Sequence, residues 1–241
     1  MRYIGIDLAW TYSKESGICI IDDNGKIIYY ESKVFTDEMI VSIVEEHAQA
    51  GAIVGIDAPL IVNNETGSRY CDGAIMREKI HGRNLSTLRR AYHNRVPAFS
   101  LTGELSDKKH VIIETFPTGI TLGLFPDAFP SKYKIKHKVE FGTTKMEMGQ
   151  IVNLLKRMSG FNPPVHNVED FFNHLLSIQA MSKQRFKNFE DRVDAFLCAY
   201  AAYWLASNDG KVFGDDQDGF ITIPVLDENS VHVGRSKDIK V

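Results

Sequence analysis

Five acidic residues lie at the ends of, or inside, apolar segments of this chain of 241 residues. They are Asp7, Asp57, Glu114, Asp191 and Asp194. A carboxylate among buried apolar residues is costly unless it is paired or bound to a metal ion. Carboxylate oxygens suit Mg²⁺ or Mn²⁺, and two such ions about 3.5–4 Å apart can activate water for phosphodiester cleavage. We therefore interpret all five acids as candidate catalytic residues, and Asp7, Asp57 and Asp194 as metal ligands.

The first two acids end two similar segments. Residues 3–7 read Tyr-Ile-Gly-Ile-Asp, and residues 53–57 read Ile-Val-Gly-Ile-Asp. Each pattern is typical of a buried strand that ends in an aspartate. In open α/β sheets, ligands bind outside the carboxyl ends of the strands, and neighbouring strands lie about 4.8 Å apart. We therefore expect Asp7 and Asp57 to share one cation, and a third buried strand to deliver Glu114 in the same way.

The other two acids belong to a long apolar helix expected over residues 190–206. Asp191 and Asp194 are three residues apart and so share one helix face. Asp194 is the only charge in the apolar part of this helix, which favours a role that compensates its burial. Purely structural roles stay open for several acids: Asp7 and Asp57 as turn residues, Glu114 as an arginine partner, Asp191 as a helix cap.

The elements that must position these acids begin with a strand-rich segment. Strand patterns cover residues 2–8, 17–22, 26–35 and 52–57. Asp23-Asn24-Gly25 is a hairpin turn signal, and a helix is expected from Thr36, which can cap it, to Gly51. The strands before and after this helix should be parallel, because the crossover between them is helical. This opening predicts an α/β fold with a mixed sheet.

The remainder of the chain mixes helices and irregular segments. Residues 62–105 lack a strand pattern and indicate an inserted segment of helix and loop, whereas a buried strand is expected at 110–116. We expect residues 118–145 to be irregular, helices at 146–158 and 168–180, and a short final strand or edge segment at 220–224. The length fits a single domain over residues 1–241.

Charge is segregated along the chain, although the net charge is only −3. Residues 69–95 hold seven Arg or Lys against two acids, and a second basic stretch contains Lys132, Lys134, Lys136 and Lys138. Segregated charge can mark a phosphate-binding surface. We predict substrate-binding roles for Trp10, Arg69, Asp72, Arg77 and Arg83. The arginines have an alternative role in ion pairing, and Trp10, which could stack on a base, has one in packing at the rim of the site.

Several short motifs resemble the family catalogued as domain of unknown function 429, predicted nucleases with a ribonuclease H-like fold. The matching segments are Gly5–Trp10, Gly55–Leu60, Arg69–Asp72, Ile113–Pro117, Asp191–Ala195, Gly214-Asp215 and Gly219–Pro224. They occur in family order along almost the whole chain, but residues 119–189 contain no such motif. The resemblance implies a ribonuclease H-like mixed sheet, an antiparallel hairpin plus parallel strands, flanked by helices and carrying a helical or loop insertion.

The layout of the acids is also similar to that of Holliday-junction resolvases of the ribonuclease H-like superfamily. That branch places one acid on the first strand, one on the strand after the first helix, and an Asp-x-x-Asp pair on a late helix. Asp7, Asp57, Asp191 and Asp194 match this layout. The resemblance implies a metal-dependent nuclease that acts on DNA or RNA, including branched or structured forms.

Two other classes of function compete with a nuclease. The first is a phosphotransferase or ATPase of the actin-like kind, which shares the core fold. The chain is too short for the two domains of that class, and it has no glycine-rich phosphate loop. The second is a non-catalytic nucleic-acid-binding module of the same fold.

Cellular context is indicated by what the sequence lacks. The N-terminal apolar run is broken at Asp7, and no apolar run approaches the roughly 20 residues needed to span a bilayer. The three cysteines have no disulfide or zinc spacing. We expect a cytoplasmic protein without a membrane partner, and we leave its oligomeric state open, a homodimer being one option.

Overall fold

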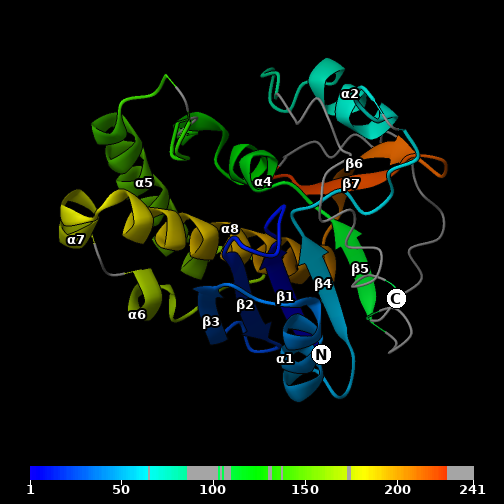
Figure 1. The fold of residues 1–241 in the computed structure, drawn as a ribbon, viewed down its shortest axis with the longest axis horizontal. Helices are drawn as coiled ribbons and strands as arrows, with labels where there is room; N and C mark the ends of the chain where they lie inside the picture. The colour runs from blue at the N-terminus through cyan, green and yellow to red at the C-terminus, as the bar shows by residue number, and fades with distance from the viewer. Residues whose placement is uncertain are drawn as a thin grey trace.

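The computed structural model describes residues 1–64, 66–85, 103, 105, 110–129, 132–136, 138–172 and 175–226. Within them, seven strands form one mixed sheet in the order β3-β2-β1-β4-β5-β7-β6 (Figure 1). The strands are β1 Arg2–Asp7, β2 Ser16–Asp22, β3 Ile27–Lys33, β4 Ala52–Ile56, β5 Val111–Glu114, β6 Gly210–Asp215 and β7 Gly219–Pro224.

Strand β1 joins the antiparallel and the parallel part of the sheet. It pairs antiparallel with β2 and parallel with β4, and β4 pairs parallel with β5. Strand β2 continues antiparallel into β3, so the N-terminal hairpins and the parallel strands share one sheet. The expected mixed α/β sheet is confirmed, and its arrangement is consistent with a ribonuclease H-like fold.

Helices cover both faces of the sheet. They are α1 Asp37–His47, α2 Tyr70–Arg77, α4 Pro117–Leu124, α5 Phe141–Lys156, α6 Val168–Phe172, α7 Leu175–Ala180 and α8 Lys183–Leu205, with 3₁₀ turns at Pro126–Ala128 and Arg157–Gly160. Helix α8 runs across the sheet (Figure 1). Helices α4 to α7 contribute side chains to the same hydrophobic core as α8. Helix α1 covers the opposite face. The side chains of β1 alternate accordingly, with Tyr3 in the core under α8 and Ile4 in the core under α1.

Helix α8 packs against the sheet at backbone distance. A Cβ atom at Gly5 would lie 1.9 Å from the carbonyl oxygen of Ala195, and one at Gly55 would lie 2.6 Å from that of Cys198. Neither position has room for a side chain, so glycine is required there. Because each glycine precedes its strand-end aspartate by two residues, this contact fixes how far the helix lies from both strand ends.

Helix α8 begins earlier than the sequence pattern indicates. The Ser182 hydroxyl accepts a hydrogen bond from the Arg185 amide and caps the helix. Asp191 therefore lies in the third turn, and the alternative that it caps the helix is wrong. Every residue from Val193 to Trp204 is buried, as the apolar pattern predicts.

One expectation about the C-terminal half was wrong. Residues 118–145 are not irregular throughout, because Pro117 starts α4 and α5 begins at Phe141. The glycines of α4 weaken the helical signal, yet Gly123 lies where the helix approaches the carbonyl oxygen of Pro224. The expected short final strand at 220–224 is confirmed as β7. The alternative that it is an edge segment is wrong, because β7 lies between β5 and β6, a strand that was not expected.

Candidate metal centre

Asp7 and Asp57 lie side by side at the carboxyl ends of β1 and β4. The two strands pair in parallel with Gly5 opposite Gly55 and Ile6 opposite Ile56. The Asp57 amide donates a hydrogen bond of 2.8 Å to the carbonyl oxygen of Ile6, so the pairing extends to the aspartates. The adjacency predicted from the repeated Gly-Ile-Asp pattern is confirmed.

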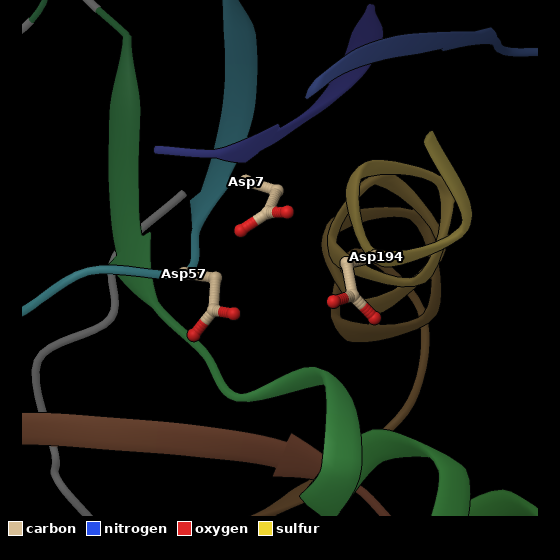
Figure 2. Close-up of side chains that lie close together, drawn as sticks. All are labelled: Asp7, Asp57 and Asp194. Carbon is tan, nitrogen blue, oxygen red and sulfur yellow. The ribbon is translucent and has the colours of Figure 1, made fainter. Parts of the chain in front are cut away.

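Asp194 completes a three-carboxylate cluster from helix α8. One oxygen from each of Asp7, Asp57 and Asp194 lies within 4.8 Å of the others, and the three side chains point toward one another (Figure 2). Cations with oxygen ligands form bonds of about 2.0–2.6 Å, so one ion can contact oxygens at these separations. The predicted convergence of these acids is confirmed, and the cluster could hold a metal ion.

A lysine lies against two of these carboxylates. Lys134 Nζ lies 2.7 Å from Asp194 Oδ2 and 3.8 Å from Asp57 Oδ2. The neighbouring Tyr133 hydroxyl donates a hydrogen bond of 2.9 Å to Asp194 Oδ1. Both oxygens of Asp194 are therefore engaged by two consecutive residues. By contrast, none of the described residues donates a hydrogen bond to the Asp7 carboxylate.

Asp191 lies one helical turn from Asp194 and is only partly neutralised. Its Oδ1 lies 2.7 Å from Lys187 Nζ, which also contacts Glu190 Oε1 at 2.8 Å. Its Oδ2 is buried and has no hydrogen-bond partner in the described part of the chain. A buried carboxylate oxygen without a donor is costly, so this atom favours a further cation or a water molecule in the site.

Three acids of the centre, Asp7, Asp57 and Asp191, have pKa values above those of ordinary carboxyl groups. Burial, followed by the charges of Asp194, Asp57 and Asp191, raises the pKa of Asp7 well above its ordinary value. Burial also raises the pKa of Asp57 to about 7, although Lys134 opposes this, and that of Asp191 to about 6, although Lys187 opposes it. The centre thus carries more negative charge than its two lysines neutralise, which a bound cation would correct.

The donor set fits a hard divalent cation. All of the converging atoms are carboxylate oxygens, and no histidine or cysteine joins the cluster among the described residues. Within the described part of the chain, no donor contacts the Asp7 carboxylate or Asp191 Oδ2, so oxygen lone pairs are available where an ion would bind. Such oxygen-only sites suit Mg²⁺, Ca²⁺ or Mn²⁺ rather than softer metals.

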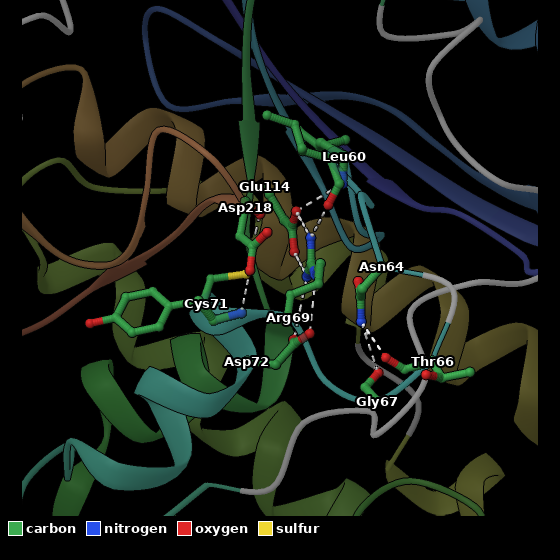
Figure 3. A network of polar contacts seen from close by, with 11 residues as sticks. Leu60, Asn64, Thr66, Gly67, Arg69, Cys71, Asp72, Glu114 and Asp218 are labelled. Carbon is green, nitrogen blue, oxygen red and sulfur yellow. Dashed lines mark hydrogen bonds and ion pairs between the residues drawn. The ribbon is translucent and has the colours of Figure 1, made fainter.

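Glu114 does not join the three-carboxylate cluster. It pairs in register with Ile56 rather than Asp57, and successive side chains of a strand point to opposite faces. It therefore faces Arg69, whose Nη1 and Nη2 donate to Glu114 Oε2 and Oε1 at 2.9 and 2.5 Å (Figure 3). The alternative that Glu114 pairs with an arginine is confirmed.

Arg69 belongs to a closed ion network rather than to a free phosphate site. Its Nε and Nη2 also donate to Asp72, and Nη1 donates to the carbonyl oxygen of Ile61 (Figure 3). Together with the two bonds to Glu114, these contacts use all five N–H groups of the guanidinium. The side chain is 2% exposed. Arg69 and Asp72 thus hold the strand end in place, and the structure leaves Arg69 no donor for a phosphate.

A cavity of about 860 Å³ opens over the carboxylates. Its lining includes Trp10, Lys14, Lys134, Lys136, Lys187 and the five predicted acids, together with Arg69 and Asp72. Arg77 and Arg83 do not line it; their guanidinium groups lie over the rings of Tyr70 and Phe129 at 5.4 and 6.0 Å. The other arginines of the predicted basic insertion, Arg89, Arg90 and Arg95, lie outside the described residues.

Three residues of the centre were missed by sequence reasoning. Lys187 precedes Glu190 and Asp191 by one helical turn, which is a readable pairing signal. Lys134 belongs to the basic stretch noted in the sequence, but nothing local links that stretch to α8. Tyr133, which is 1% exposed, gives no signal in the sequence.

Comparison with known proteins gives a family but no relative of established activity. A family model described as "Protein of unknown function (DUF429)" matches residues 5–218, which includes every acid of the centre. No curated protein sequence matches the chain. In the part of the chain that the structure describes, no helix is long and apolar enough to cross a bilayer.

Proposed function

We propose that this chain, which belongs to the DUF429 family, is a divalent-metal-dependent nuclease that hydrolyses phosphodiester bonds of DNA or RNA. One observation carries the proposal: carboxylates from two strand ends and one helix converge in an open cavity that is also lined by lysines. The acids suit Mg²⁺ or Mn²⁺, and the lysines suit the phosphates of a nucleic acid.

The roles of the residues follow from their positions. Asp7, Asp57 and Asp194 would hold the cation. A bound Mg²⁺ or Mn²⁺ supplies Lewis acidity and lowers the pKa of bound water. Asp191 lines the cavity, and its Oδ2, which has no donor among the described residues, can accept a hydrogen bond from an attacking water and orient it.

The cavity also offers contacts for the rest of the substrate. Lys136 is exposed and lines the cavity, and Lys14 lines it from the loop after β1, so both can bind phosphates beside the cleaved bond. Trp10 follows Asp7 by three residues and is partly exposed in the cavity. It can stack on an unpaired base, which would favour a single-stranded or splayed substrate.

Cleavage of a labelled panel tests this function. The panel holds single- and double-stranded DNA, RNA, RNA–DNA hybrid and a four-way junction, each with Mg²⁺, Mn²⁺ or EDTA. Asp7→Asn should abolish cutting, because it removes a metal ligand and keeps the shape of the side chain. Asp216→Asn is the matched control, since Asp216 is exposed in the β6–β7 turn and does not line the cavity.

Each outcome of the panel has a distinct meaning. Metal-dependent cutting that Asp7→Asn loses and Asp216→Asn keeps would support the proposal and identify the substrate. Cutting that both variants keep would indicate a contaminant. A folded protein that binds nucleic acid and metal but cuts no member of the panel would favour a non-catalytic binding module.

A further inference from the structure

Lys134 contacts two of the carboxylates that a bound cation would also contact. Its ammonium lies against Asp194 Oδ2 at 2.7 Å and near Asp57 Oδ2 at 3.8 Å, and both residues belong to the three-carboxylate cluster. Its side chain is 19% exposed, and it lines the cavity. The lysine therefore reaches two of the three ligands from the substrate side of the site.

The segment that carries Lys134 is held in place without this lysine's charge. The Tyr133 ring is buried in the core under α8. The Ile135 amide donates to Glu190 Oε2 at 2.8 Å, and the Lys132 amide donates to Glu147 Oε2 at 2.5 Å. These contacts fix the backbone on both sides of Lys134. The lysine side chain is thus free to change its partner while its backbone stays in position.

We propose that Lys134 is an internal counterion that competes with the metal ion for Asp194 and Asp57, and that it turns to the substrate phosphate when these carboxylates bind metal. The inference rests on the proposed function and adds a residue to it. An ammonium and a divalent cation repel each other, so a cation bound to Asp194 Oδ2 weakens the contact of Lys134 with the same oxygen. When Asp194 and Asp57 ligate a cation, Lys134 loses its partners.

The cavity determines which anion can replace those partners. Lys134 and Lys136 line the same cavity, and the acids nearest to Lys134 are the metal ligands themselves. The remaining acids of the centre, Asp191 and Glu190, already contact Lys187. A phosphate that enters the cavity is therefore the anion that can satisfy Lys134 beside a loaded site. Lys134 thereby couples metal loading to substrate binding.

Metal binding without substrate tests the first part of the inference. The affinity for Mn²⁺ is measured by calorimetric titration of the wild type and three variants. Lys134→Met removes the charge, Lys134→Arg retains it, and Lys138→Met is a surface control. Lys138 belongs to the same basic stretch, is exposed and does not line the cavity. We expect Lys134→Met to bind Mn²⁺ at least about tenfold more tightly, because the competing charge is gone. Lys134→Arg and Lys138→Met should stay near the wild type.

Cleavage kinetics at saturating Mn²⁺ test the second part. Lys134→Met should lower kcat/KM at least about tenfold despite its tighter metal binding, because a charged contact to phosphate is lost. A lysine that only holds its loop in place would not produce opposite effects on metal affinity and cleavage. If Lys134→Met does not fold, Lys134→Gln replaces it. The glutamine can still donate a hydrogen bond to Asp194, and the expectations are the same.

The design separates failure of this inference from failure of the proposed function. A wild-type protein that binds no Mn²⁺ contradicts the metal centre itself. A wild type that binds Mn²⁺ and cuts nucleic acid, with Lys134→Met unchanged in metal affinity, overturns the competition. Tighter metal binding with unchanged cleavage overturns the transfer of Lys134 to phosphate.

Discussion

Two groups of acids line the same cavity but differ in how completely their charge is satisfied. In the first group, Arg69 directs all of its N–H groups at Asp72, Glu114 and one backbone carbonyl. The second group consists of the converging aspartates, Asp191 and Glu190. Among the described residues, the cations that contact this group are Lys134 and Lys187. The first group needs no ligand, whereas in the second Asp191 Oδ2 has no donor among the residues that the structure describes. The supply of donors, rather than the number of buried acids, separates the structural cluster from the candidate metal centre.

Removing the arginine of the closed network should have the largest effect on stability. Arg69→Met leaves Asp72 and Glu114 buried without their cation, and breaking a buried ion pair in this way costs about 3–5 kcal/mol. Urea unfolding should show this loss. Arg77→Met, which removes an exposed guanidinium over Tyr70, should cost less than about 1 kcal/mol. Equal losses in the two variants would mean that the network is not the support described above.

Removing an acid of the candidate metal centre should reduce cleavage without reducing stability. Asp57→Asn should lower cleavage at least about 100-fold, which corresponds to about 2.7 kcal/mol in the barrier, because a metal ligand is lost. The free energy of unfolding of the metal-free protein should not fall, because the substitution relieves repulsion among the acids. Cleavage kinetics check the first expectation, and urea unfolding checks the second. A variant that loses stability as Arg69→Met does would remove the distinction between the groups.

The pH dependence of stability should sharpen the same distinction. The pKa of Asp57 is raised from 3.8 to about 7, so the folded protein holds a proton that the unfolded chain releases between these values. The metal-free protein should therefore lose stability as the pH rises through this window. We expect a loss of about 2 kcal/mol from pH 5 to 7.5, since one pKa unit corresponds to about 1.4 kcal/mol.

Unfolding at a series of pH values in EDTA measures the slope of the unfolding free energy against pH. The slope should be smaller in Asp57→Asn, which cannot titrate at this position, and saturating Mg²⁺ should reduce it in the wild type. A wild-type slope of the opposite sign, with stability rising from pH 5 to 7.5, would contradict the excess negative charge of the centre.

The smallest expected effect concerns the rim of the cavity. Lys136→Met should weaken nucleic-acid binding and lower the slope of log K against log salt by about one, because one phosphate contact is lost. Fluorescence anisotropy over a range of salt concentrations, in an Asp7→Asn background that does not cut, measures this. Lys26→Met, in the hairpin turn between β2 and β3, is the control. Binding that salt does not weaken would argue against any phosphate contact in the cavity.

The parts of the centre that could be predicted are those encoded in short local patterns. Alternation and the repeated Gly-Ile-Asp ending place Asp7 and Asp57 on neighbouring parallel strands. Asp194 is identified because it is the single charge in the apolar part of its helix. Glu114 was misplaced because its face depends on the register of β5 against β4, and a shift by one residue reverses the face. Short-range sequence patterns do not contain this register.

Other features depend on contacts between distant parts of the chain. Lys134 meets Asp194 across 60 residues of sequence, so its basic neighbours indicate only a charged loop. Strand β6 was missed because its pairing with β7, rather than its own composition, stabilises it. Arg69 was interpreted as a phosphate ligand because an arginine that binds an acid and one that binds a phosphate look the same in sequence.

The glycine contacts between the sheet and α8 have a consequence for synthesis of the chain. Gly5 and Gly55 are translated before the helix backbone that fills the space above them, which begins at residue 183. A nascent chain can pair β1 with β4 and align Asp7 with Asp57 long before Asp194 leaves the ribosome. Until then the strand ends lack their third carboxylate. The carboxylate cluster is therefore complete only after α8 has been translated, and a product that ends before α8 would carry the strands without the site.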